Sequence, residues 1–206
     1  DSLIRAAEQA LLTLAMRTAG MDVLLVVGAP LENAGKLYNT AVCIRDGQIL
    51  GVTVKTKLPN YAEGVEVRYF AVPEPEETQM VLGGTQIPFG TGLLFCMKEM
   101  PGFKLGIEIC EELWVPDAPS VGLALAGATV IANPSAGAIF AGKQEERRNK
   151  VKAQSLQLKA AYLYANAGEG ESTTDLVYSG QGFIAESGTM LAEGIPFETK
   201  YFSTEI

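Results

Sequence analysis

The sequence of 206 residues contains no histidine, and this absence limits the chemistry available to the chain. Enzymes that pair a cysteine or serine nucleophile with an imidazole base are excluded. Only lysine, carboxylate and backbone groups remain to move a proton or to lower the pKa of a thiol. The sequence also has no C-x-x-C pair and no clustered aspartates of the calcium-loop kind. We therefore expect no metal site.

Positive charge is in the minority, with 16 Lys and Arg residues against 24 Asp and Glu residues and a net charge of -8. Such a balance disfavours nucleic acid and anionic membranes as partners. Apolar residues make up 48% of the chain, enough for one domain with a large core. Their runs have only the length of strands, which predicts no membrane span. The basic cluster at 143–152 is interrupted by Glu145 and Glu146, and we interpret it as a solvated helix face rather than a phosphate site.

The chain has three cysteines, which cannot all pair, and it shows no secretory segment. These features predict a reducing, cytoplasmic location. Cys43 lies in an alternating strand and Cys96 follows an apolar run, so we expect both in the core. Cys110 ends another apolar run and precedes two acidic residues and a turn, where catalytic nucleophiles often lie. Its position alone leaves both roles open, because most lone cysteines fill cores.

Hydrophobic periodicity predicts strands that alternate with helices and are interrupted by hairpins. A helix should begin near residue 1 and end at Gly20, and a strand at 23–27 should be buried on both faces. Hairpins should turn at Asp46-Gly47 and at 186–188. Further strands are expected at 87–96, 104–109, 129–133 and 161–167, and helices at 120–126 and 143–160. The apolar stripe of the first helix comprises Leu3, Ala7, Ala10, Leu11 and Leu14. The fold class is α/β, with mixed strand directions and sheets covered by helices.

A lysine segment, Lys-Thr-Lys-Leu-Pro-Asn-Tyr-Ala-Glu at 55–63, is the second notable feature. Lys55 ends a hairpin strand, where most lysines are solvated. The alternative is a fixed cation that holds a thiolate and later binds an oxyanion. Other segments complete a longer pattern: 35–41, 87–91, 108–116, 133–136, 142–143 and 168–177, with Glu63, Glu66, Arg68 and Arg148.

Together these segments resemble the nitrilase superfamily of carbon–nitrogen hydrolases. Within it they are most similar to the glutaminase domain of glutamine-dependent NAD+ synthetases, on the strings Glu-Ile-Cys-Glu and Gly-Glu-Ser-Thr-Thr-Asp-Leu-Val. The resemblance implies a nitrilase-like αββα sandwich. It also implies that residues 1–206 form a partial domain, without its first strands and helix and without a C-terminal synthetase domain.

The resemblance also implies a catalytic set, with Cys110 as nucleophile, Lys55 as catalytic lysine and Glu63 as a supporting glutamate. Lys55 is preferred to Lys57 because two residues separate it from Leu-Pro, as in the family. Ser135 matches a position expected to bind substrate. The other positions expected to bind substrate are Tyr61, Glu111 and Arg148.

The implied reaction is hydrolysis of the glutamine amide through a cysteine thioester, with the ammonia passing to an ATP-dependent synthetase domain of the same polypeptide. No cofactor is expected for the glutaminase part, whereas ATP, Mg and deamido-NAD belong to the synthetase domain. A large homo-oligomer is expected. The family's general-base glutamate belongs to a segment before residue 1, so we expect the chain alone to be inactive.

Several residues depart from the family pattern near the expected pocket. They are Gly64, Val65, Gly137, Ala138, Ile139 and Arg147. These departures keep two alternatives open: a nitrilase-type amidase for another small amide, and a catalytically silent scaffold. The string at 168–177 favours the glutaminase over the other amidase.

Overall fold

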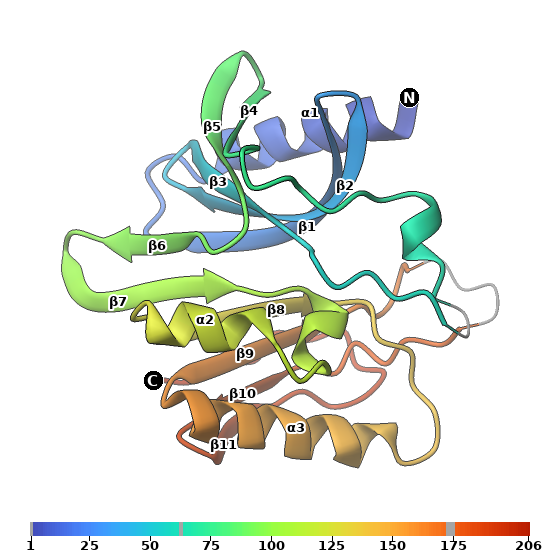
Figure 1. The fold of residues 1–206 in the computed structure, drawn as a ribbon. Helices are drawn as coiled ribbons and strands as arrows, with labels where there is room; N and C mark the ends of the chain where they lie inside the picture. The colour runs from blue at the N-terminus through green and yellow to red at the C-terminus, as the bar shows by residue number, and fades with distance from the viewer. Residues whose placement is uncertain (1, 62–63, 172–175) are drawn as a thin grey trace. The chain divides into compact units, whose positions relative to one another are not determined.

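The computed structural model describes residues 2–61, 64–171 and 176–206, which form two compact units, Asp1–Leu93 and Leu94–Ile206 (Figure 1). Each unit contains one sheet and its helices. Within the described ranges, no helix has both the length and the apolar character required to cross a membrane. The helical elements are α1 (Ser2–Arg17), α2 (Pro119–Leu125), α3 (Lys143–Leu158) and two 3-10 turns, η1 (Glu66–Arg68) and η2 (Cys110–Leu113).

The first unit is a five-stranded sheet in the order β1-β2-β3-β5-β4. Its pairs are antiparallel except β3–β5, which is parallel. The predicted hairpin is confirmed, because Asp46 and Gly47 have φ values of 46° and 79° between β2 and β3. Two positive φ angles make the type I′ turn that suits strand twist. The strands are β1 (Leu24–Asn33), β2 (Lys36–Arg45), β3 (Gln48–Val54), β4 (Gln79–Leu82) and β5 (Thr85–Gly90).

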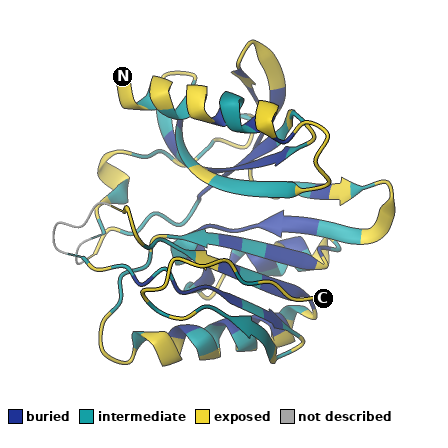
Figure 2. Cartoon of the chain, turned by 180° about the vertical axis from the view of Figure 1, so that it is seen from behind, coloured by how far each residue is buried: buried dark blue, intermediate teal, exposed yellow. Residues whose placement is uncertain are grey.

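Helix α1 packs on β1 and β3 of this sheet. Its predicted apolar stripe is correct at Leu11 and Leu14, which contribute to the core, but wrong at Leu3 and Ala10, which are exposed. Figure 2 shows most of α1 in the colours of exposed and intermediate residues. The fully buried residues of the helix are Leu11 and Ala15, at the helical spacing of four residues. Because apolar residues also occur next to the buried side of the helix, the sequence alone did not show which of them would face the sheet.

The expected burial of the strand at 23–27 was also wrong. The apolar run at 23–27 predicted a strand buried on both faces, yet β1 lies at the end of its described sheet and is mostly half-buried. An apolar run carries information about packing on the faces of a strand, but none about its number of hydrogen-bonded neighbours. Cys43, on the neighbouring strand β2, is buried as predicted.

The second unit is a six-stranded sheet in the order β11-β10-β9-β8-β7-β6. Its central strands β7, β8 and β9 are parallel, and the outer pairs are antiparallel. Helix α3 packs on β9, β10 and β11, and α2 packs on β7 and η2 (Figure 1). The strands are β6 (Leu94–Met97), β7 (Met100–Ile107), β8 (Val130–Ser135), β9 (Ala161–Asn166), β10 (Phe183–Glu186) and β11 (Thr189–Glu193).

Two expectations for this part of the chain were wrong. The single strand expected at 87–96 is two strands, β5 and β6, which belong to different sheets. Cys96 is exposed rather than in the core, because alternation along the edge strand β6 buries Phe95 and turns its neighbour outward. The second predicted hairpin is confirmed, with Ser187 and Gly188 at φ values of 49° and 83° between β10 and β11.

Candidate active site

Cys110 lies just beyond the carboxyl end of β7, as the sequence predicted. The strand ends at Ile107, and the chain enters η2 at Cys110 itself. The φ angle of Cys110 is 51°, in the left-handed region that non-glycine residues seldom adopt. Such backbone strain costs on the order of 1–3 kcal/mol and concentrates at functional sites. The residue is half-buried, so its environment is neither a packed core nor open solvent.

The backbone of Cys110 is held by a side chain of the adjacent strand. Its N–H donates to Oδ1 of Asn133 over 3.2 Å. Ser135 Oγ donates to the same oxygen over 2.6 Å. Asn133 is buried on β8, which pairs in parallel with β7 and carries this side chain to the strand end. The predicted site residue Ser135 is thus joined to the predicted nucleophile through Asn133.

A buried carboxylate lies behind this contact. Glu108 accepts hydrogen bonds from the backbone N–H of Ser120, over 2.8 Å, and from the hydroxyl of Tyr162. That hydroxyl accepts from Nδ2 of Asn133 over 3.0 Å. Burial raises the pKa of Glu108, although the hydrogen bonds from Tyr162 and Ser120 act in the opposite direction. The only sequence signal for this group was a glutamate within an apolar strand, which by itself indicated no role for the side chain.

A second buried charge, Arg147, lies on α3. Its Nη2 donates to the carbonyl oxygens of Gly137 and Ala138, over 3.2 and 3.1 Å, and its guanidinium carbon is 5.5 Å from the ring centroid of Tyr164. Burial raises the pKa of Tyr164 to about 12, and the charge of Arg147 opposes that rise. The solvated-face interpretation of 143–152 was therefore wrong at Arg147. A Cβ at Gly137 would lie 2.9 Å from Nη2, so glycine makes room for the guanidinium.

The predicted lysine belongs to the first unit. Lys55 follows β3 directly and is fully buried, which excludes a solvated strand-end lysine. Its Nζ lies 2.7 Å from Oε1 of Glu66, and Oε2 of Glu66 accepts from Nδ2 of Asn39 over 3.1 Å. The structure thus brings Lys55 together with Glu66, a motif residue for which the sequence indicated no role. Glu63 lies outside the described residues.

The remaining predicted substrate residues occupy three different settings. Tyr61 is 61% exposed in the loop after β3. Glu111 is half-buried and follows Cys110 directly in η2. Arg148 on α3 pairs through Nε with Oε2 of Glu193 over 2.9 Å, at the side of β11. Their roles in substrate binding stay predictions.

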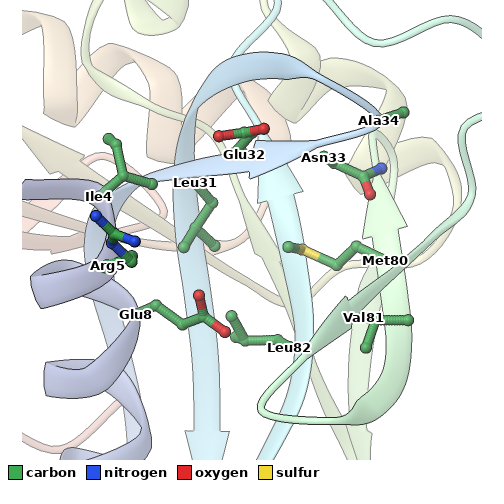
Figure 3. Close-up of a pocket in the computed structure, with 10 residues that line it drawn as sticks. All are labelled: Ile4, Arg5, Glu8, Leu31, Glu32, Asn33, Ala34, Met80, Val81 and Leu82. Carbon is green, nitrogen blue, oxygen red and sulfur yellow. The ribbon is translucent and has the colours of Figure 1, made fainter. Parts of the chain in front are cut away.

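Each unit also contains a cavity of its own. The first, of about 500 Å³, lies between α1 and the ends of β1 and β4, where Arg5, Glu8 and Asn33 supply polar groups (Figure 3). The second, of about 750 Å³, is bordered by residues 168–171, which begin the motif segment at 168–177. Neither is lined by Cys110 or Lys55. Side chains of the described ranges form no cluster of three or more His, Cys, Asp or Glu residues suited to a metal ion.

Comparison with known proteins agrees with the resemblance seen in the sequence. A glutamine-dependent NAD(+) synthetase from Mycobacterium tuberculosis is 49% identical over 197 residues, which are 96% of this chain and 29% of that protein. A synthetase of the same name from Thermotoga maritima is 29% identical over 207 residues, which span 100% of this chain and 32% of that protein. The chain therefore spans about a third or less of the length of these relatives.

Solved structures match the fold. A glutamine-dependent NAD(+) synthetase from Cytophaga hutchinsonii superposes with a TM-score of 0.80 over 94% of this chain and 30% of its own, at 28% identity. A carbon–nitrogen hydrolase from Helicobacter pylori G27 gives a TM-score of 0.70 over 96% of this chain and 66% of its own, at 19% identity. The predicted fold class, α/β of the nitrilase type, is confirmed. The family model described as carbon–nitrogen hydrolase matches residues 2–205, and the chain belongs to that family.

Proposed function

We propose that this chain supplies the nucleophile and the substrate site for hydrolysis of the side-chain amide of glutamine by the full polypeptide, and that the ammonia serves an NAD+-forming reaction of the same polypeptide. The observation that carries the proposal is Cys110, held by Asn133 in a left-handed conformation at the end of a parallel strand. The 49% identity with a glutamine-dependent NAD(+) synthetase supports the choice of substrate. ATP, Mg and deamido-NAD would be bound outside this chain, by a synthetase domain. A cytoplasmic location and a homo-oligomeric state belong to the same proposal.

The proposed reaction has two stages and needs no cofactor. The Cys110 thiolate attacks the amide carbon, a C–S bond forms, and the carbonyl electron pair moves to oxygen. Collapse of this oxyanion breaks the C–N bond, and the nitrogen leaves as ammonia after gaining a proton. Water then attacks the thioester, forming a C–O bond and breaking the C–S bond, which releases glutamate and restores the thiol.

Developing charge on the oxygen requires donors. We assign that role to the backbone N–H of Glu111, which follows the nucleophile, and to the ammonium group of Lys55. Glu66, paired with Lys55 at 2.7 Å, supports this assignment because it fixes a buried lysine in position. Proton transfer falls to a carboxylate, since the sequence contains no histidine. Ser135, Arg148 and Tyr61 are proposed to contact the glutamine.

A coupled assay of glutamate and ammonia tests the proposal. The full polypeptide that contains residues 1–206 should release both in equal amounts from glutamine, and Cys110→Ser should abolish the release. Cys96→Ser, a matched change at an exposed cysteine, should leave it unchanged. Residues 1–206 alone should release neither, because the expected general base is not among them. Hydrolysis of other small amides but not of glutamine would favour a different amidase. If the full polypeptide hydrolyses no amide, or if its Cys110→Ser variant retains the parent rate, the proposal fails.

A further inference from the structure

Three side chains and one backbone group in the second unit form a continuous series of hydrogen bonds. It runs from Glu108 through the Tyr162 hydroxyl and the Asn133 amide to the N–H of Cys110. Glu108, Tyr162 and Asn133 are all buried, and they come from the parallel strands β8 and β9 and the segment just after β7. At one end of the series the backbone N–H of Cys110 is a donor, and at the other end the carboxylate of Glu108 is an acceptor. The two ends therefore differ in kind, which gives the series a direction.

The direction follows from the donors and acceptors. A carboxylate only accepts, so the backbone N–H of Ser120 and the Tyr162 hydroxyl both donate to Glu108. With its proton committed, the Tyr162 oxygen accepts from Nδ2 of Asn133. An amide has one donor end and one acceptor end, so Oδ1 of Asn133 then faces Cys110. The N–H of Cys110 can only donate, and it needs that oxygen.

We propose that Glu108 is a positioning residue that orients the Asn133 amide, so that its oxygen holds the backbone of Cys110 in the left-handed conformation. Glu108 does not touch the reacting atoms, and it acts through Tyr162. The inference rests on the proposed role of Cys110 as nucleophile. It adds a residue to the site that lies outside the predicted set of catalytic and substrate-binding residues.

Replacing Glu108 by glutamine should reverse the series. The N–H of Ser120 still requires an acceptor, so the glutamine oxygen stays there and its NH2 group turns towards Tyr162. The hydroxyl then accepts from that NH2 group and donates onward, which requires the Asn133 amide to turn over. Two donors would meet at Cys110, and a residue at φ 51° would lose the bond that holds it.

The order of severity among variants separates this mechanism from a merely structural role. Glu108→Met neither accepts nor donates, so Tyr162 and Asn133 remain free to keep their orientation. The isosteric Glu108→Gln should therefore be more harmful than Glu108→Met. Adding Tyr162→Phe to Glu108→Gln should restore function. This second change removes the Tyr162 hydroxyl, which links residue 108 to the Asn133 amide and would otherwise force that amide to turn over. A role in packing alone predicts the opposite order and additive losses.

The experiment measures three quantities for the full polypeptide that contains residues 1–206 and for each variant of it. They are kcat and KM for glutamine, the rate of Cys110 alkylation by iodoacetamide read by peptide mass spectrometry, and the melting temperature. Glu108→Gln should lower kcat by about 10- to 100-fold, the cost of a nucleophile misplaced by about an ångström relative to a bound substrate, with little change in KM. Iodoacetamide is not held in place, so the alkylation rate should fall by less but in the same order among the variants. The Glu108→Gln/Tyr162→Phe variant should match Tyr162→Phe alone. Glu146→Gln, an exposed residue of α3, is the control and should match the parent.

Several outcomes would overturn the inference. They are a Glu108→Gln variant with the kcat and alkylation rate of the parent, a Glu108→Met variant with a lower kcat than Glu108→Gln, and a Glu108→Gln/Tyr162→Phe variant with a lower kcat than Glu108→Gln. Where Glu108→Gln yields no folded protein, the double variant decides alone, and it must equal Tyr162→Phe. Alkylation needs no glutamine turnover. If no protein hydrolyses glutamine while alkylation keeps the expected order, the proposed function fails and the positioning role of Glu108 stands.

Discussion

The buried ion pair of Lys55 and Glu66 allows a quantitative prediction for Glu66→Gln. The parent carboxylate accepts from Lys55 Nζ over 2.7 Å and from Asn39 Nδ2 over 3.1 Å. Glutamine keeps only one acceptor oxygen, so its NH2 group must face one of these two donors. Lys55 is fully buried, and its ammonium group would lose a charged partner in surroundings that solvate it poorly.

The expected cost follows from the burial of the two partners. Removing one member of a buried pair costs about 3–5 kcal/mol. The Glu66 side chain is 25% exposed, so water compensates in part and the lower end, about 3 kcal/mol, applies. For a chain of this size, about 1 kcal/mol shifts the melting temperature by about 2–4 °C, which predicts a fall of about 6–12 °C.

Thermal unfolding followed by circular dichroism measures this fall. Glu146→Gln is the matched control, because its pair with Lys143 at 3.0 Å is solvent-exposed and should change stability by no more than about 0.5 kcal/mol. Adding Lys55→Met to Glu66→Gln should recover most of the loss, since an apolar replacement removes the unpaired charge. A Glu66→Gln protein as stable as the control, or a double variant less stable than the single, would refute the reasoning.

Two further predictions concern the lysines and the cysteines. In the full polypeptide, Lys55→Ala should lower glutamine hydrolysis by about 10²–10³-fold, the contribution of one oxyanion donor, whereas Lys57→Ala should keep most of the activity in the same ammonia assay. The reverse result would move the catalytic role to Lys57. Brief iodoacetamide treatment at pH 8 should label Cys110 and Cys96 but spare Cys43, because burial raises the pKa of the Cys43 thiol to about 12 and keeps it protonated and covered. Peptide mass spectrometry measures the three sites separately, and labelling of Cys43 in folded protein would contradict its burial.

Local chemistry made several features readable from the sequence. Asp46-Gly47 predicted a hairpin because few residue pairs accept two positive φ angles, and the structure confirms that turn. The apolar run before Cys110 predicted a strand that ends near a candidate nucleophile, and β7 ends at Ile107. In both cases the information lies within a few consecutive residues. The motif strings carried the family, which the family model over 2–205 confirms.

The candidate site itself depended on the tertiary structure. Glu108 and Tyr162 are 54 positions apart, and Cys110 and Asn133 are 23 apart. They meet because β7, β8 and β9 pair in parallel in one register, and no local pattern specifies which strands become neighbours. The same limit explains the partner of Lys55, since no sequence pattern gave Glu66 a role and only its distance from Nζ identifies it.

The burial of individual side chains was also only partly predictable from the sequence. Alternation in the sequence predicted the buried Cys43, but it could not show that β6 is an edge strand on which Cys96 faces solvent. A basic, acidic-flanked helix predicted a solvated face, yet Arg147 is buried against Gly137 and Tyr164. Sequence alone determined the two hairpin turns, the strand before Cys110 and the family, because these depend on short-range sterics and on whole motifs. Only the tertiary structure decided which charges are buried and which groups they meet, because burial and pairing depend on segments that are distant in the chain.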